Sequence, residues 1–214
     1  MPFREHLIGI GQQRLRLIIG ELMQRELEMI RGTLKKNYQG LSKSELLDKV
    51  YELGWNFGLY SGSCSQCTVA ALQELLGFED VVVRVASSSC GGQAIQIMGT
   101  CGALIGGTMV LDYYFGRLLE DMSYKQEVNK DRLFEATGVA KLLYDRFIKK
   151  YGAMSCATIQ QKVFGRVYWI TDPDEAAKFD EAGAHSDPDK CMDIVGDAAR
   201  WTMEILIDKG VVKL

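Results

Sequence analysis

The N-terminal part of the chain has the hydrophobic spacing of a long amphipathic helix. Between residues 12 and 36, apolar side chains recur every three or four positions, and Glu and Arg occupy the other face. Strong helix formers fill the segment, and Gly32 and Gly40 mark its end. We expect this helix to pack onto the domain or onto a second copy of the chain. Its apolar positions are Leu15, Ile19, Leu22, Met23, Leu27, Ile30 and Leu34.

A second helix is predicted from residue 42 to about residue 58. Ser42 and Glu45 have the spacing of a capping box, in which each side chain accepts a hydrogen bond from the other residue's backbone N–H. Glycines recur every four residues along this helix, so we expect either that a neighbouring backbone comes close to that face or that the helix frays there. These glycines are Gly54, Gly58 and Gly62.

The two helices suggest how the chain is organised into domains. We expect them to form an N-terminal helical hairpin within an extension, residues 1–58, that contains no cysteine. Residues 59–214 would then form a cysteine-bearing helical domain. Its first helix is predicted after Ser63, a plausible N-cap, and ends at Gly77.

Residues 85–111 contain no Asp, Glu, Lys or Arg, although a quarter of the chain is charged. The stretch is long enough to cross a bilayer, but its serines, glutamines and glycines argue against that, and we expect it to be buried in a soluble core. Its second half predicts a helix from Cys101 to about residue 118, with Thr100 as the cap. Gly102 and Gly106 give this helix a face on which a neighbouring helix can lie close.

The segment 80–86 is ambiguous. Its run of valines favours a strand, but the only other strand candidate is residues 166–171. We therefore predict a short buried helix. With helices also expected over 124–151, from Ser155 and from Cys191, the predicted fold class is all-α, a multi-helix bundle-like domain.

Residues 171–190 are rich in acids, and their only large apolar side chain is Phe179. We predict a solvated loop or lid here.

Composition narrows the class of function. The net charge is −3, and no cluster of Lys and Arg is present to bind nucleic acid. The N-terminus lacks the apolar core of a signal peptide. We expect a cytoplasmic protein without membrane insertion, in which cysteines stay reduced unless they bind metal or cycle catalytically.

Four of the six cysteines lie at predicted helix starts. A helix N-terminus lowers the pKa of a thiol and favours the thiolate, the form that binds metals and attacks disulfides. The other two, Cys67 and Cys90, fit best as small buried hydrophobic residues, although Cys64 and Cys67 have the spacing of a redox or metal pair. The four are Cys64, Cys101, Cys156 and Cys191.

Other catalytic arrangements have little support. The chain has two histidines, His6 near the N-terminus and His185 in the acidic segment, so a Cys–His pair would need one of these. No phosphate-binding loop, dinucleotide-binding glycine motif, serine-hydrolase motif or zinc-protease motif is present.

The sequence Cys101-Gly102-Ala103-Leu104-Ile105-Gly106 carries a resemblance. With one cysteine before it, Cys64, and two after it, Cys156 and Cys191, it resembles the C-GCAxxG-C-C family of redox-active proteins. A similar module occurs in split-Soret cytochromes, which carry an iron–sulfur cluster beside their haems. This chain lacks the C-x-x-C-H haem motif, and it departs from the family in its first 58 residues, in Cys67 and Cys90, and in the acidic segment.

The resemblance implies a mostly helical fold and redox work through the four motif cysteines. Our leading hypothesis is that these four bind an iron–sulfur cluster, most simply [2Fe–2S], for electron transfer with an unknown redox partner. A thiol–disulfide oxidoreductase is the alternative, with Cys64, Cys67 and Cys101 as candidate catalytic residues and Cys90 as another resolving thiol. A structural zinc site on the four motif cysteines is the third reading. The N-terminal amphipathic helix is compatible with a homodimer.

Overall fold

The computed structural model describes residues 32–124, 126–128 and 130–214. This part of the chain contains eight α-helices, two short 3-10 helices and no strand, so the all-α prediction is confirmed. The helices are α2 (Lys43–Ser61), α3 (Cys64–Leu76), α4 (Asp80–Val85), α5 (Gly102–Phe115), α6 (Asp131–Tyr151), α7 (Cys156–Phe164), α8 (Pro173–Glu181) and α9 (Cys191–Asp208), with 3-10 turns η1 (Lys36–Tyr38) and η2 (Leu119–Asp121).

Most of the expected first helix, residues 12–36, lies outside the described residues, as does His6. Where its last residues are described, at 32–35, the backbone is not helical. Leu34 is buried there, and the backbone N–H of Lys35 donates to the carbonyl oxygen of Leu75 on α3. The prediction that the helix reaches Lys36 is therefore wrong. Among the described helices, none has both the length and the apolar character needed to cross a bilayer.

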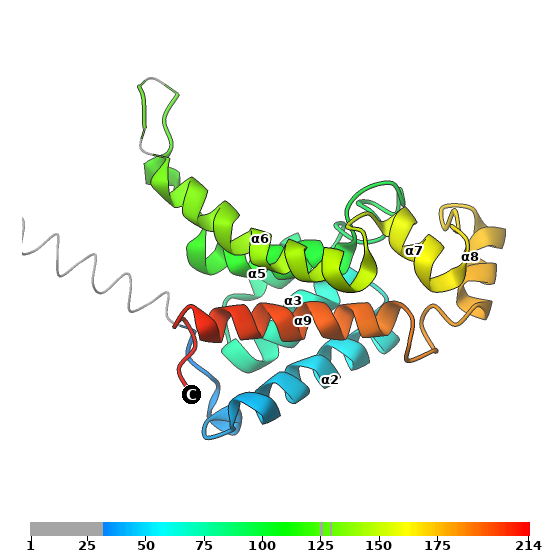
Figure 1. The fold of residues 1–214 in the computed structure, drawn as a ribbon, viewed down its shortest axis with the longest axis horizontal. Coiled ribbons are helices and arrows are strands. Elements are labelled where there is room, and N and C mark those ends of the chain that lie inside the picture. The colour runs from blue at the N-terminus through cyan, green and yellow to red at the C-terminus, as the bar shows by residue number, and fades with distance from the viewer. Residues whose placement is uncertain (1–31, 125, 129) are drawn as a thin grey trace, which may run out of the picture. The chain divides into compact units, whose positions relative to one another are not determined.

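Helix α9 is the central element of the fold (Figure 1). It contacts α2, α3, α5 and α6, and eleven of its residues are buried. Gly54 and Gly58 on α2 bring the two helices close together. A Cβ atom on Gly54 would lie 3.0 Å from the carbonyl oxygen of Val195, and one on Gly58 would lie 2.5 Å from the sulfur of Met192. The predicted close approach is confirmed at these two glycines, whereas Gly62 ends α2 in a left-handed conformation.

Helix α2 starts at the predicted capping box. Ser42 Oγ accepts from the Glu45 N–H (3.3 Å), and the Glu45 carboxylate accepts from the Ser42 N–H (2.9 Å). The helix then packs against α9 and α3, within a compact unit that runs from Gly32 to Leu214. The domain boundary proposed after residue 58 falls inside α2, and the described residues do not divide there.

Glycines on α5 also allow close packing. A Cβ atom on Gly106 would collide with the carbonyl oxygen of Ser65 in the first turn of α3, and one on Gly107 would lie 2.5 Å from Thr202 Oγ1 on α9. The small residues of α5 therefore allow neighbouring helices to pack closely against it, as predicted. The helix ends at Phe115, three residues before the predicted end.

The segment before α5 is less buried than predicted. Helix α4 forms where a short helix was expected, but none of its residues is fully buried, and Val81 and Val85 are more than half exposed. Residues 86–99 form a loop in which Met98 is 67% exposed. Ile97 anchors this loop: it is fully buried, and its N–H donates to the carbonyl oxygen of Gly91 (2.7 Å). A lack of charge in this stretch therefore did not mean burial.

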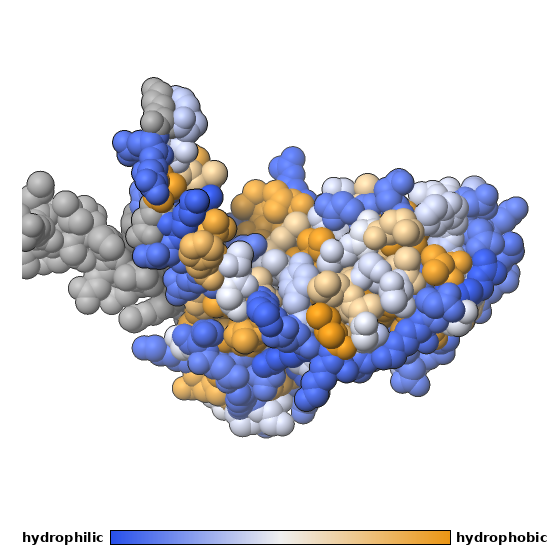
Figure 2. All heavy atoms as spheres, turned by 45° about the horizontal axis from the view of Figure 1, so that its top comes forward, coloured by the Kyte–Doolittle hydropathy of each residue, from blue (hydrophilic) through white to orange (hydrophobic). Residues whose placement is uncertain are grey.

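The acidic segment 171–190 contains helix α8, so the prediction of a solvated loop is wrong. Asp172 caps the helix by accepting hydrogen bonds from two backbone N–H groups of its first turn. Phe179 is buried in a small second apolar cluster with Tyr168 and Ala184. Most of the acids are exposed, and the region where α8 lies is mostly hydrophilic in Figure 2. One buried ring and one cap are enough to fix this helix on the domain.

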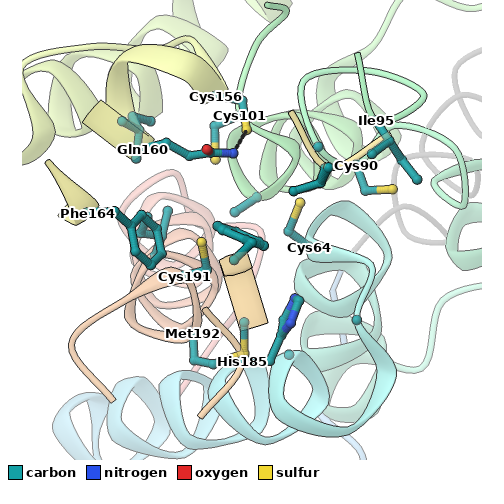
Figure 3. A pocket seen from close by; sticks show the side chains of 18 of the residues that line it. Cys64, Cys90, Ile95, Cys101, Cys156, Gln160, Phe164, His185, Cys191 and Met192 are labelled. Carbon is teal, nitrogen blue, oxygen red and sulfur yellow. Dashed lines mark hydrogen bonds between the residues drawn. The ribbon is translucent and has the colours of Figure 1, made fainter. Parts of the chain in front are cut away.

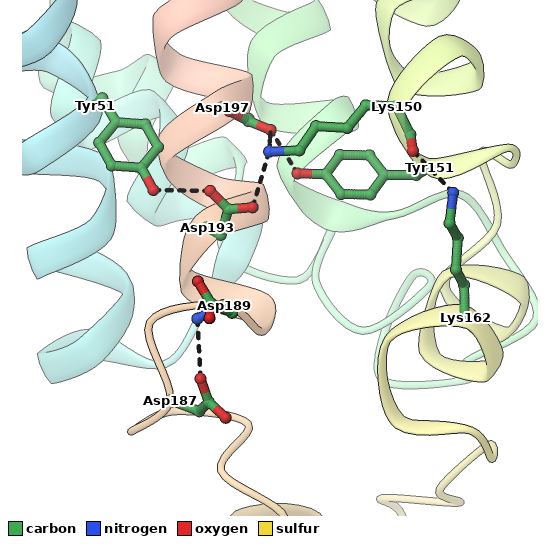
Figure 4. A network of polar contacts seen from close by, with 8 residues as sticks. All are labelled: Tyr51, Lys150, Tyr151, Lys162, Asp187, Asp189, Asp193 and Asp197. Atoms are coloured by element: carbon green, nitrogen blue, oxygen red, sulfur yellow. Dashed lines mark hydrogen bonds and ion pairs between the residues drawn. The ribbon is translucent and has the colours of Figure 1, made fainter.

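A buried polar network joins α9 to α6 and α2 (Figure 4). The Asp197 carboxylate accepts from Lys150 Nζ (2.5 Å) and from the Tyr151 hydroxyl (2.6 Å). Asp193, one turn earlier on α9, accepts from the same Lys150 and from the Tyr51 hydroxyl (2.7 Å). The network therefore bonds three helices together beside the largest apolar core.

Replacing Asp197 with alanine is expected to lower the free energy of unfolding by about 2 kcal/mol. The Tyr151 hydroxyl would lose its acceptor inside the protein, whereas Lys150 is partly exposed and can regain water. Urea denaturation measures the change. Asp145→Ala is the control, because Asp145 pairs with Lys141 on the exposed face of α6 and should contribute only about 0.3 kcal/mol. If both variants lost the same free energy of unfolding, the network around Asp197 would not stabilise the fold more than an exposed ion pair does.

Candidate functional site

Five cysteines line one cavity of about 270 Å³ (Figure 3). In the view of Figure 3, Cys101 and Cys156 lie together at one side, His185 lies at the opposite side, and Cys64 and Cys191 lie between them. The rest of the wall is mostly apolar. The five cysteines are Cys64, Cys90, Cys101, Cys156 and Cys191, and all are free thiols.

A short backbone pairing brings Cys101 and Cys156 to the same place. Thr100 and Ser155 form an isolated antiparallel bridge. The N–H of Cys101 donates to the carbonyl oxygen of Met154 (2.8 Å), and the N–H of Cys156 donates to that of Gly99 (2.8 Å). Each cysteine follows its bridge residue directly, so the bridge sets where both thiols enter the cavity.

The bridge also corrects the role predicted for Thr100. Thr100 does not cap α5. Cys101 itself occupies the N-cap position, without a side-chain cap, and the helix begins at Gly102. A helix was expected to start at Ser155, and this residue is the N-cap of α7, with its hydroxyl accepting from the Thr158 N–H.

Cys64 and Cys191 enter from two further helix starts. Cys64 is the first residue of α3, and Cys191 is the first residue of α9. Gly102 makes room for Cys64: a Cβ atom at this position would collide with Cys64 Sγ. The expectation that all four motif cysteines lie at helix starts is therefore confirmed.

Burial keeps these thiols protonated. It is the largest cause that raises the pKa of Cys64, Cys101, Cys156 and Cys191, and for Cys156 the pKa rises to about 11. Repulsion between neighbouring thiolates raises the pKa further: Cys191 is affected by the other three. Hydrogen bonds from backbone N–H groups at the start of α5 lower the pKa of the Cys101 thiol. The prediction that the helix starts alone would favour thiolates is therefore wrong, because desolvation outweighs them.

The raised thiol pKa values predict that the metal-free protein loses stability in alkali. Below about pH 8.5 a cysteine is protonated in both the folded and the unfolded chain. Above that pH the unfolded chain releases the proton while the folded chain keeps it, so the unfolded state is favoured by up to about 1.4 kcal/mol per pH unit per thiol. For Cys156 this loss extends to about pH 11.

Urea denaturation of reduced, metal-free protein between pH 7 and pH 10 checks this. The free energy of unfolding should fall with pH above about 8.5. Cys156→Ser should give a shallower fall than the wild-type chain, because serine does not titrate in this range. A stability that is constant or rises over the same range would contradict the burial of neutral thiols.

Of the two remaining cysteines, Cys67 lies in the core as predicted, whereas Cys90 does not. Cys67 is buried and its thiol donates to the carbonyl oxygen of Phe57 (3.3 Å), away from the cavity wall. It has the place of a small core residue, so it is not brought together with the catalytic candidates Cys64 and Cys101. Cys90, which was expected to be a plain buried residue, lies on the cavity wall in the loop 86–99. A lone cysteine in a glycine-rich loop gave no signal of this.

The sequence also gave no indication of the part of the cavity wall that comes from residues 164–185. It includes His185, the neighbouring Asp180 and the rings of Phe164 and Phe179. His185 Nδ1 lies 2.7 Å from an oxygen of Asp180. Their spacing of five residues, across the end of α8, matched no known motif, so only the three-dimensional arrangement reveals the pair.

The arrangement of the side chains bears on the kind of metal centre. In the described part of the chain, no three His, Cys, Asp or Glu side chains are grouped as ligands of a single metal ion. A zinc ion needs sulfurs that are all about 2.3 Å from one point. A cluster places its metal atoms at several points, so its cysteine ligands are spread over a wider site. Among the described residues, the thiols line one cavity without forming the close group that a single ion requires.

Comparison with known proteins adds one finding. Residues 62–205 match the sequence model of a family described as "Putative redox-active protein (C_GCAxxG_C_C)". This span includes all four motif cysteines and confirms the resemblance drawn from them. No curated protein and no solved structure matches the chain.

Proposed function

The chain belongs to the C-GCAxxG-C-C family of redox-active proteins, and from this premise we propose that it binds an iron–sulfur cluster and transfers electrons. Cys64, Cys101, Cys156 and Cys191 would hold the cluster, most simply a [2Fe–2S] centre. Bound there, the cluster would supply one-electron transfer. The observation that carries the proposal is the convergence of these four thiols, from four helix starts, on one cavity.

The electrostatics of the cavity fit a cationic guest. Burial among apolar side chains is the largest cause that keeps these thiols neutral, and repulsion between neighbouring thiolates adds to it. Iron cations and the positive ends of the helices would offset that charge, and a thiol that coordinates a metal loses its proton. The site therefore suits thiolates only when a metal centre is present.

The apolar wall supports the same function. Ala103, Ile159 and Ile194 line the cavity between the cysteines. Such a wall limits the access of water, and solvent exposure is one of the factors that set the reduction potential of a cluster.

Anaerobic purification of the full chain tests the proposal. The protein should be brown and should contain iron and acid-labile sulfide in similar amounts. Its visible absorption should bleach on reduction with dithionite and return on reoxidation. Colourless protein without iron and sulfide, even after reconstitution with ferrous iron and sulfide, would overturn the proposal.

A thiol–disulfide exchange is the second candidate, and one observation favours it. A Cβ atom on Gly102 would collide with Cys64 Sγ and would lie 2.9 Å from Cys90 Cα, so these two cysteines adjoin the same point of the backbone. In such an exchange, Cys64 and Cys90 would give two electrons and two protons to a disulfide of the partner. The partner would become a dithiol, and the two cysteines would form a disulfide.

Thiol titration separates the two candidates. In the exchange reaction, oxidised glutathione should remove two titratable thiols from the metal-free protein, and Cys90→Ser should prevent this loss. In the cluster-binding protein, Cys90→Ser should leave the iron and sulfide contents unchanged, because Cys90 is not one of the four proposed ligands.

A further inference from the structure

The part of the cavity wall that carries His185 has the features of a second binding site. It is built by the segment from the end of α7 to His185, which supplies two rings, Phe164 and Phe179. Their centroids are 5.1 Å apart, and the Tyr168 ring packs behind both. Ala176, on α8, lines the same end with a small side chain. This end therefore has an aromatic wall that borders the open space of the cavity.

His185 is the polar group of this end. Its Nδ1 faces the Asp180 carboxylate at 2.7 Å, and its ring packs edge-on against Phe179, with centroids 5.7 Å apart. The Asp180 carboxylate accepts a hydrogen bond from Nδ1–H, and this bond fixes the orientation of the ring. Among the described residues, no protein group hydrogen-bonds Nε2. An oriented imidazole on a cavity wall thus has one nitrogen available for a ligand.

The chemistry of the wall limits the kind of ligand. An anion would face the Asp180 carboxylate, and a charged group of either sign would lose its hydration against phenylalanine and isoleucine side chains. A flat ring packs well on an aromatic wall. One hydrogen-bonding atom on such a ring could reach the imidazole.

We propose that this end of the cavity binds a small, neutral, planar molecule that carries one hydrogen-bonding group, and that His185, oriented by Asp180, contacts that group. The site adjoins the proposed cluster, but the inference does not rest on the cluster. It rests on the cavity, the aromatic wall and the His185–Asp180 pair.

Acetophenone and ethylbenzene are matched probes for this site. They have similar size and shape, but only acetophenone carries a carbonyl oxygen. In titrations of the full-length protein followed by calorimetry and by the His185 ring resonances, acetophenone should bind about two- to tenfold more tightly than ethylbenzene. In His185→Phe, which keeps a ring beside Phe179, the two probes should bind equally. Equal affinity for both probes in the wild-type protein, or no binding of either, would overturn the inference.

A second pair of variants locates the site. Ala176→Leu should fill the space in front of the aromatic wall and lower acetophenone affinity at least tenfold. Ala177→Leu is the control, because Ala177 is the next residue of the same helix and is exposed outside the cavity. Circular dichroism verifies that both variants fold. Unchanged binding in Ala176→Leu would show that the probe binds elsewhere and would overturn the assignment. Iron and sulfide contents measured on the same samples report separately on the cluster.

Discussion

Serine in place of Cys101 is expected to lower the iron and sulfide content of anaerobically purified protein at least tenfold. Cys101 lies at the N-cap of α5 beside Cys156, and repulsion from Cys64 and Cys156 helps to raise the pKa of its thiol. Removal of one ligand thiolate would leave a metal atom of the cluster with one ligand too few. Even substitution of residues that only hydrogen-bond to metal ligands lowers metal affinity about 10- to 100-fold. Iron and sulfide analysis with the visible spectrum measures the loss.

Cys67→Ser is the matched control for this experiment. Cys67 is three residues from Cys64 on the same helix, but its thiol bonds the Phe57 carbonyl oxygen outside the cavity wall. The variant should keep its cluster, with at most a modest loss of stability. If Cys67→Ser lost the cluster and Cys101→Ser kept it, the proposed ligand set would be wrong.

Leucine in place of Gly106 is expected to lower the free energy of unfolding by about 3 kcal/mol or more and to disturb the site without altering a cysteine. A Cβ atom at this position would collide with the carbonyl oxygen of Ser65 and would lie 3.0 Å from Thr68 Cβ. Both contacts are on α3, and Ser65 directly follows Cys64. A shift of α3 away from α5 would therefore move a proposed ligand. For a chain of this size, the melting temperature should fall by about 6–12 °C.

Gly138→Leu is the control for the effect of removing a helical glycine. Gly138 lies on α6, and a Cβ atom there would meet no atom within 4 Å. This substitution should raise stability by up to about 1 kcal/mol, because leucine favours the helix more than glycine does. Thermal unfolding and iron analysis of both variants provide the comparison. A Gly106→Leu protein with wild-type stability and cluster content would refute the close packing of α3 and α5.

Local sequence rules predicted most of the helices. The Ser42–Glu45 capping box and the helix-ending glycines Gly77 and Gly152 lie where they were expected. These signals act between residues a few positions apart, so they can be read without knowledge of the fold. The same rules missed α8, because its Asp172 cap and its Pro173 start were overlooked among many acids.

Burial was harder to predict. The uncharged residues 86–99 form a largely exposed loop, and α4 is not fully buried, although its valines suggested a core. In contrast, Phe179 in the acidic segment is buried. Hydropathy describes the average preference of a residue, whereas burial depends on which other elements pack over it.

The sequence by itself determined the all-α class, the helix starts that carry the four motif cysteines, and the glycines on α2 and α5 at which helices pack closely. All of these follow from local periodicity, capping and the absence of a side chain. Only the tertiary structure decided which thiols share a cavity, so that Cys90 lines it and Cys67 does not. It also decided that burial keeps the motif thiols neutral, and that His185 lies across the cavity from Cys101 and Cys156. Those properties depend on distances between residues far apart in the chain and on the loss of water around them, which no local pattern encodes.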